Sequence, residues 1–148
     1  MRTGRLLRGA LAGLAVGLSA FAWGAAPGGR FVVQGNETVR DGRTGLVWPH
    51  RPSAGKLDWA AAKAWCEGLG LAGGGWRLPS RKELETLVDR RARNPAMDVT
   101  AFPAGVAGGY WTATPYVGTG GKTWQVDFAD GSATPAANEA RLQVTCVR

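Results

Sequence analysis

GGGWRLPSRKELETLVD, residues 73–89, is the stretch that decides the fold, because it contains a loop, an extended run and a helix start within seventeen positions. The glycines at 73–75 permit a sharp turn, and Pro79 holds Leu78 at extended backbone angles. Ser80 and Glu83 have the spacing of a capping box, in which each side chain satisfies a backbone N–H at the start of a helix. We therefore predict a structural motif without chemistry of its own, made of Trp76, Arg77, Leu78, Pro79, Ser80 and Glu83.

The capping box predicts a helix that runs onward from residue 81. Leu84, Leu87 and Val88 supply its apolar face, and the helical pattern fades at residues 93–95. We interpret Arg77 as a structural residue that pairs with an acidic side chain across the core.

The N-terminal residues have the layout of a secretory signal peptide. Arg2, Arg5 and Arg8 flank the start of an apolar run at residues 9–22, and small residues follow. We assign residues 1–25 to the signal peptide and residues 26–148 to one folded domain. The alternative is a retained anchor, since residues 9–26 nearly reach the roughly 18 apolar residues that a membrane span needs. Both readings predict export. After cleavage we expect a secreted or periplasmic protein without a membrane span.

The net charge of the mature chain is small. The whole chain has a formal charge of +7, which falls to +4 without the three arginines of the signal peptide. An exported protein of this charge is not expected to bind nucleic acid. The charge favours either attraction to an anionic polysaccharide or surface, or solubility alone.

Cys66 and Cys146 are the only two cysteines of the chain. In an oxidising compartment an even pair predicts one disulfide in preference to a metal site or a redox pair. A catalytic cysteine is the alternative, but the single histidine, His50, lies between two turn-like residues and has no evident partner.

Patterns along the rest of the chain predict short strands around two helices. The first helix starts after Asp58 and places Trp59, Ala62, Cys66 and Leu69 on its inner face. A long ordered loop covers residues 94–109. Strands are predicted at residues 30–34, 38–40, 46–48, 110–115 and 124–128, with a final strand at 141–148.

Several segments in this order resemble the Legionella-collagen-like C-terminal (Lcl C-terminal) domain family. They are VRDGRTGLVW, LDWAAAKAWCEGL, GGGWRLPSRKELETLVD, FP, YWTAT, WQVDFADG and TCVR. The family is a variant of the C-type-lectin-like fold, which is related to the fold of the formylglycine-generating, sulfatase-modifying enzymes. The resemblance implies an α+β domain with two helices packed on small antiparallel β-sheets, long loops and a disulfide from the first helix to the last strand.

The resemblance also implies export and, in better-understood relatives, adhesion or glycan binding. The acid-Pro-Asn and Trp-Asn-Asp motifs of calcium-dependent lectins do not occur here, so we predict no metal and no cofactor. The related enzymes use a cysteine pair near the active site, whereas the pair here is interpreted as the structural bridge. We therefore predict a protein that is not an enzyme.

Candidate ligand-binding residues lie on loops and on the basic second helix. The long loops at 96–109 and 115–122 are the predicted binding surface, with Tyr116 and Lys122 as candidates. Arg90 and Arg91 belong to a basic cluster that suits sulfate or carboxylate groups, although a solvated helix face is the alternative. Trp65 lies off the inner face of the first helix and is the candidate for an aromatic surface contact. The other tryptophans considered, Trp48, Trp59, Trp76, Trp111 and Trp124, lie in apolar patterns and are expected in the core.

The sequence thus predicts an exported, non-catalytic module that binds a glycan or an envelope or surface protein. A structural or assembly module that contacts another envelope protein is the second hypothesis. An enzyme of the formylglycine-generating type is the third.

Overall fold

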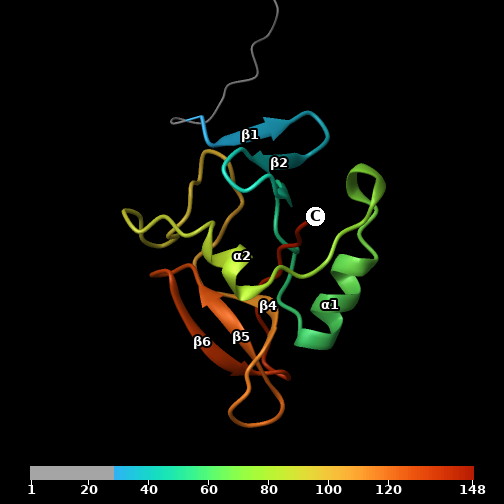
Figure 1. Ribbon diagram of the computed structural model, residues 1–148, viewed down its shortest axis with the longest axis vertical. Helices are drawn as coiled ribbons and strands as arrows, with labels where there is room; N and C mark the ends of the chain where they lie inside the picture. The colour runs from blue at the N-terminus through green and yellow to red at the C-terminus, as the bar shows by residue number, and fades with distance from the viewer. Residues whose placement is uncertain (1–28) are drawn as a thin grey trace, which may run out of the picture.

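The structure is a computed structural model that describes residues 29–148, and the predicted signal peptide lies outside these residues. It has the expected α+β composition. Figure 1 shows two small sheets at opposite ends of the domain, with helices α1 and α2 between them. Within residues 29–148, no helix is long and apolar enough to cross a bilayer.

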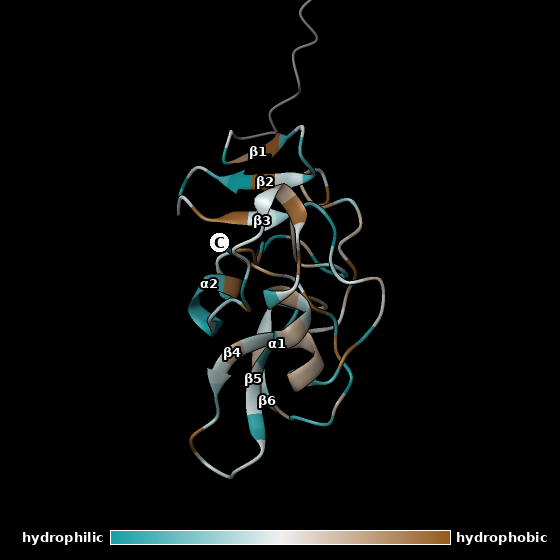
Figure 2. Cartoon of the chain, turned by 90° about the vertical axis from the view of Figure 1, so that its right-hand side faces the viewer, coloured by the Kyte–Doolittle hydropathy of each residue, from teal (hydrophilic) through white to brown (hydrophobic). Residues whose placement is uncertain are grey.

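The first sheet is antiparallel and has the order β1-β2-β3. Its strands are β1 (Phe31–Gln34), β2 (Thr38–Asp41) and β3 (Val47–Pro49), and Figure 2 shows them stacked at one end of the domain. These strands confirm the prediction from β-branched and aromatic content.

The second sheet is antiparallel with the order β4-β5-β6. Strands β4 (Gly109–Pro115) and β5 (Lys122–Asp127) were expected. Strand β6 (Ser132–Ala137) was not predicted, because its sequence SATPAA lacks the usual strand residues and contains a proline. Pro135 is tolerated since β6 is an edge strand, with β5 on one side only.

The prediction of a regular strand at residues 141–148 is wrong. This segment is extended but makes only isolated bridges, Leu57 with Leu142, Tyr110 with Gln143 and Arg77 with Val147. It passes through the core between several partners, and Val144, Thr145, Cys146 and Val147 are all buried. Because these four consecutive residues are all buried, the side chains of this segment do not alternate between a buried and an exposed face as expected.

Helix α1 (Trp59–Glu67) begins as predicted. The Asp58 side chain accepts the Ala61 N–H, and Gly68 caps the C-terminus. A short 3-10 turn follows at Leu71–Gly73.

Helix α2 (Arg81–Glu85) has the predicted capping box, but it is much shorter than expected. After Glu85 the backbone continues in turns, with Leu87 N–H donating to Leu84 O at 3.0 Å. The Asp89 N–H donates to Ala96 O at 2.9 Å, so the chain folds back where a longer helix would have continued. Leu84 and Leu87 still reach the core.

The predicted disulfide between Cys66 and Cys146 is present, with an S–S distance of 2.07 Å and a sequence separation of 80 residues. It joins α1 to the C-terminal segment inside one of two apolar clusters, together with Trp76, Leu78 and Trp111. The other cluster lies around α2 and β5 and includes Trp48. Of the five tryptophans expected in the core, Trp48, Trp76 and Trp111 are buried, whereas Trp59 and Trp124 are half-buried.

Candidate functional site

A groove lined by four cationic side chains lies between the first sheet and the C-terminal end of α2. Its volume is about 580 Å³, and we call it the basic groove. Two of its cations come from residues 30–43 and two from residues 82–90, so only folding brings them together. The lining residues are Arg30, Arg43, Thr44, Lys82, Glu85, Thr86, Val88 and Arg90.

Buried Asp41, at the end of β2, organises one wall of the basic groove. Its carboxylate accepts hydrogen bonds from Arg30 Nε at 3.0 Å and Nη2 at 2.6 Å. The Arg43 N–H and the Thr44 hydroxyl also donate to it, each at 2.9 Å. Burial alone would raise the pKa of Asp41, but the donors from Arg30, Arg43 and Thr44 hold that pKa below its usual value. Asp41 therefore stays ionised and fixes three residues of the wall.

The remaining cations of the basic groove are uncompensated. Arg43, Lys82 and Arg90 are exposed, and they form no ion pair within residues 29–148. Glu85 is the one acid of the lining, and its carboxylate pairs with Arg81 at 2.9 Å. The groove therefore presents free ammonium and guanidinium groups, which suit sulfate, phosphate or carboxylate groups.

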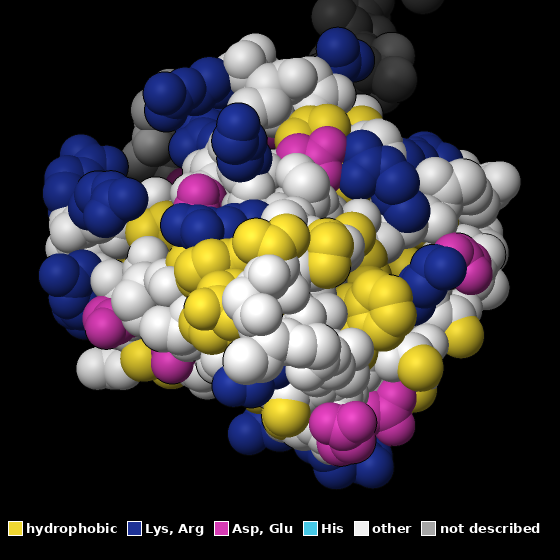
Figure 3. All heavy atoms as spheres, turned by 60° about the horizontal axis from the view of Figure 1, so that its bottom comes forward, with side chains coloured by type: hydrophobic (Ala, Val, Ile, Leu, Met, Phe, Trp, Pro, Cys, Tyr) yellow, Lys and Arg dark blue, Asp and Glu magenta, His cyan; other side chains and the backbone are white. Residues whose placement is uncertain are grey.

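An aromatic cluster lies beside this groove. The Arg81 guanidinium stacks 4.1 Å from the centre of the Trp124 ring, and Tyr116 meets the same ring edge-on at 5.5 Å. The Tyr116 N–H donates to Lys122 O at 3.1 Å, which places both predicted residues at the base of the β4–β5 loop. On the face in Figure 3, hydrophobic side chains gather in the middle and Lys and Arg side chains lie around them.

The predicted binding residues fall in separate places. Arg90 lines the basic groove, whereas Arg91 lies outside it, is 92% exposed and pairs with Asp89 at 3.3 Å. Trp65 lies on α1 and lines a hollow of about 200 Å³ that is otherwise formed by Glu37, Pro49, Arg51, Pro52, Leu69 and Leu71. A role in binding for these residues stays a prediction.

The predicted binding loop at 96–109 is partly buried and partly exposed, and its role in binding stays a prediction. Met97, Ala101 and Phe102 are buried in the core, while Val99 and Val106 are exposed. The groove residues Arg30 and Arg43 were missed, because nothing in the local sequence indicates that they meet residues 82–90.

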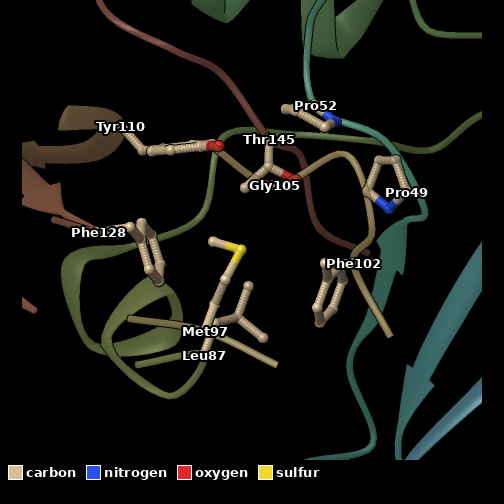
Figure 4. A pocket seen from close by; sticks show the side chains of 9 residues that line it. All are labelled: Pro49, Pro52, Leu87, Met97, Phe102, Gly105, Tyr110, Phe128 and Thr145. Atoms are coloured by element: carbon tan, nitrogen blue, oxygen red, sulfur yellow. The ribbon is translucent and has the colours of Figure 1, made fainter. Parts of the chain in front are cut away.

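A small apolar cavity lies behind this loop. Its volume is about 20 Å³, and Figure 4 shows Met97 pointing into it between Phe102 and Phe128. This space holds at most about one water molecule, and an apolar lining of this size usually stays dry. It is a packing feature of the core and not a ligand site.

Arg77 is paired as predicted with an acid, but the expected location across the core is wrong. Its guanidinium binds both carboxylate oxygens of Glu83, at 2.8 and 2.9 Å, on the half-exposed surface of the same motif. Glu83 also accepts the Ser80 N–H at 2.7 Å. These bonds, the Arg77 pair first, lower the pKa of Glu83 to about 2. In the described part of the chain, no cluster of three or more His, Cys, Asp or Glu side chains could hold a metal ion.

Comparison with known families agrees with the resemblance of the sequence motifs. The Lcl C-terminal domain matches residues 37–148, a range that contains both cysteines and every helix and strand except β1. No curated protein matches the chain. The family match and the disulfide together indicate a secreted, surface-associated module of an extracellular or envelope compartment. Because the match covers most of its length, the chain belongs to the Lcl C-terminal domain family.

Proposed function

We propose that this chain is an exported, non-catalytic module that binds an anionic polysaccharide at the cell surface or in the envelope. The observation that carries the proposal is the basic groove, where Arg43, Lys82 and Arg90 are exposed without ion-pair partners in the described chain. Asp41 holds Arg30 and the backbone of Arg43 in place before any ligand arrives. Such preorganisation lowers the entropic cost of binding.

Groups beside the groove support a polysaccharide as the ligand. Trp124 and Tyr116 are half-buried and contact each other edge-on, and Arg81, which stacks on Trp124, is linked to the groove through Glu85. A polysaccharide offers anionic groups to the cations and sugar rings to such aromatic side chains.

The state of the cysteines supports a role without catalysis. Both cysteines of the chain are joined in the buried disulfide, which leaves no free thiol. A formylglycine-generating type of enzyme would need a reactive cysteine, so the binding role is favoured over the enzymatic one.

The test is binding of residues 26–148 to immobilised heparin and polygalacturonate, measured by surface plasmon resonance at several salt concentrations. The double variant Arg43→Ala/Arg90→Ala removes two groove cations. The matched control, Arg40→Ala/Arg141→Ala, removes the same charge at exposed positions outside the groove.

We expect the groove variant to lower affinity about tenfold or more and the control about twofold or less, since only the groove cations meet the ligand directly. Binding should survive calcium chelation and weaken with salt. Equal losses of affinity in both variants would show that binding depends only on the net charge of the domain and not on the groove. If the unaltered domain does not bind, the proposal is rejected.

Contact with an envelope protein is a second candidate function, favoured by the hollow around Trp65. Its lining is mostly apolar, with Pro49, Pro52, Leu69 and Leu71 around the indole. Tryptophan in an apolar pocket is a common anchor of protein interfaces. Affinity capture from envelope extracts with the unaltered domain and with Trp65→Ala tests this candidate, which requires a partner that the variant no longer retains.

A further inference from the structure

Another concave site lies near the N-terminal end of α2, between α1 and β4. Its volume is about 360 Å³, and we call it the Trp59 hollow. Helix α1, the residues just before α2 and strand β4 each contribute to it. The lining residues are Trp59, Lys63, Glu67, Arg77, Leu78, Ser80 and Ala113.

Trp59 can offer a ligand only the surface of its ring. Its Nε1 already donates to Thr112 O at 3.0 Å, and the side chain packs against the apolar cluster that contains the disulfide. The indole is therefore held in one orientation, and Leu78 and Ala113 add apolar surface beside it. A flat apolar face of this kind binds the C–H surface of a ring by stacking.

The rim of the Trp59 hollow carries charges of both signs. Lys63 and Glu67 lie 3.7 Å apart and are 55% and 58% exposed, so both remain free to change partners. Arg77 lies on the same rim and is held by Glu83. Hydrogen-bond donors beside an acceptor suit the hydroxyl groups of a neutral ligand. An isolated anion would be repelled by Glu67, and an isolated cation would be repelled by Lys63 and Arg77.

The hollow and the basic groove are close enough for one extended ligand. Ser80 of the hollow and Lys82 of the groove are two residues apart. Helix α2, which separates the two sites, has five residues and is therefore about 7.5 Å long.

We propose that the Trp59 hollow binds an uncharged sugar ring of a polysaccharide whose anionic groups occupy the basic groove. This inference rests on the proposed function. It assigns the hollow a part in selecting sugar polymers over other polyanions, which the groove cations alone would not distinguish.

The test compares two probes, partially sulfated dextran and inorganic polyphosphate. The first carries sulfate groups and uncharged glucose rings, and the second carries charge without rings. Trp59→Ala is a poor test variant because it would remove a core contact. Ala113→Leu instead fills the hollow from an exposed strand position, and Ala61→Leu is the matched control at an exposed position of α1 outside the hollow.

We expect Ala113→Leu to weaken binding of sulfated dextran about three- to tenfold and to leave polyphosphate binding unchanged, the range typical of one aromatic contact. Ala61→Leu should change neither. Unchanged dextran binding in Ala113→Leu would overturn the hollow as a subsite while the proposed function stands. Failure of the unaltered domain to bind either probe would overturn both.

Discussion

Glu83 connects two features at the residue scale, the start of α2 and the position of Arg77. Its carboxylate accepts hydrogen bonds from the Ser80 backbone N–H and from both terminal nitrogens of Arg77. The spacing of Ser80 and Glu83 predicted the capping box, but no sequence rule indicated that the same carboxylate would also bind Arg77.

Glu83→Gln is expected to lower the free energy of unfolding by about 1 kcal/mol, because the two-bond ion pair with Arg77 is lost, whereas the glutamine oxygen can still accept the Ser80 N–H. The pKa of Glu83 falls from 4.5 to about 2 on folding, so its contribution is present above pH 4.5 and is lost as pH falls toward 2. Urea unfolding at pH 7 and pH 3 checks this, and the variant should differ from the unaltered protein less at pH 3. Glu67→Gln, in an exposed pair, should cost about 0.5 kcal/mol or less. Equal effects of the two substitutions would contradict the role of Glu83.

Asp41→Asn is expected to destabilise the domain by about 2–3 kcal/mol, because an amide cannot accept all the donors that now meet this buried carboxylate. The folded pKa of Asp41 is lowered, so acidification below the usual range of aspartate should have a similar effect. Thermal unfolding measures the loss of stability. At temperatures below the melting transition, the affinity for polysaccharide should also fall. A destabilised variant with unchanged affinity would show that Asp41 does not order the groove for binding.

At the scale of elements, the turn between β5 and β6 depends on a glycine. Gly131 has a φ of +84°, and a Cβ at this position would lie 2.5 Å from Val88 Cγ1. Gly131→Ala should therefore cost about 1–2 kcal/mol from the backbone angle, with a further loss from the contact. Gly120→Ala is the control, because a Cβ there would have no neighbour within 4 Å. Chemical denaturation of both variants is the measurement, and similar stabilities would show that the turn tolerates a side chain.

The elements that sequence patterns missed are those that depend on their neighbours. Strand β6 pairs along its whole length with β5, and this pairing outweighs the weak strand preference of SATPAA. Helix α2 ends early because Asp89 and Ala96 pair their backbones and reverse the chain. In both cases a backbone partner outside the segment itself decided what the segment's own preference left open.

At the scale of the whole molecule, the Cys66–Cys146 disulfide closes most of the folded domain into one loop. Replacing both cysteines by alanine should lower the free energy of unfolding by about 2–4 kcal/mol, chiefly by freeing the unfolded chain. Calorimetry should show a melting temperature lower by about 10 °C or more. Reduction of the unaltered protein should have a comparable effect, and an unchanged melting temperature with both thiols free would contradict this prediction.

The sequence by itself determined the starts of both helices, most of the strands, the disulfide and the family, because these follow from local spacing, from a single pair of cysteines and from ordered motifs. Only the tertiary structure decided where the candidate site lies. Arg30 and Arg43 meet Lys82 and Arg90 because a buried carboxylate, Asp41, fixes the first sheet's side of the groove. Ion pairing and concavity arise between segments far apart in the chain, so no local pattern contains them.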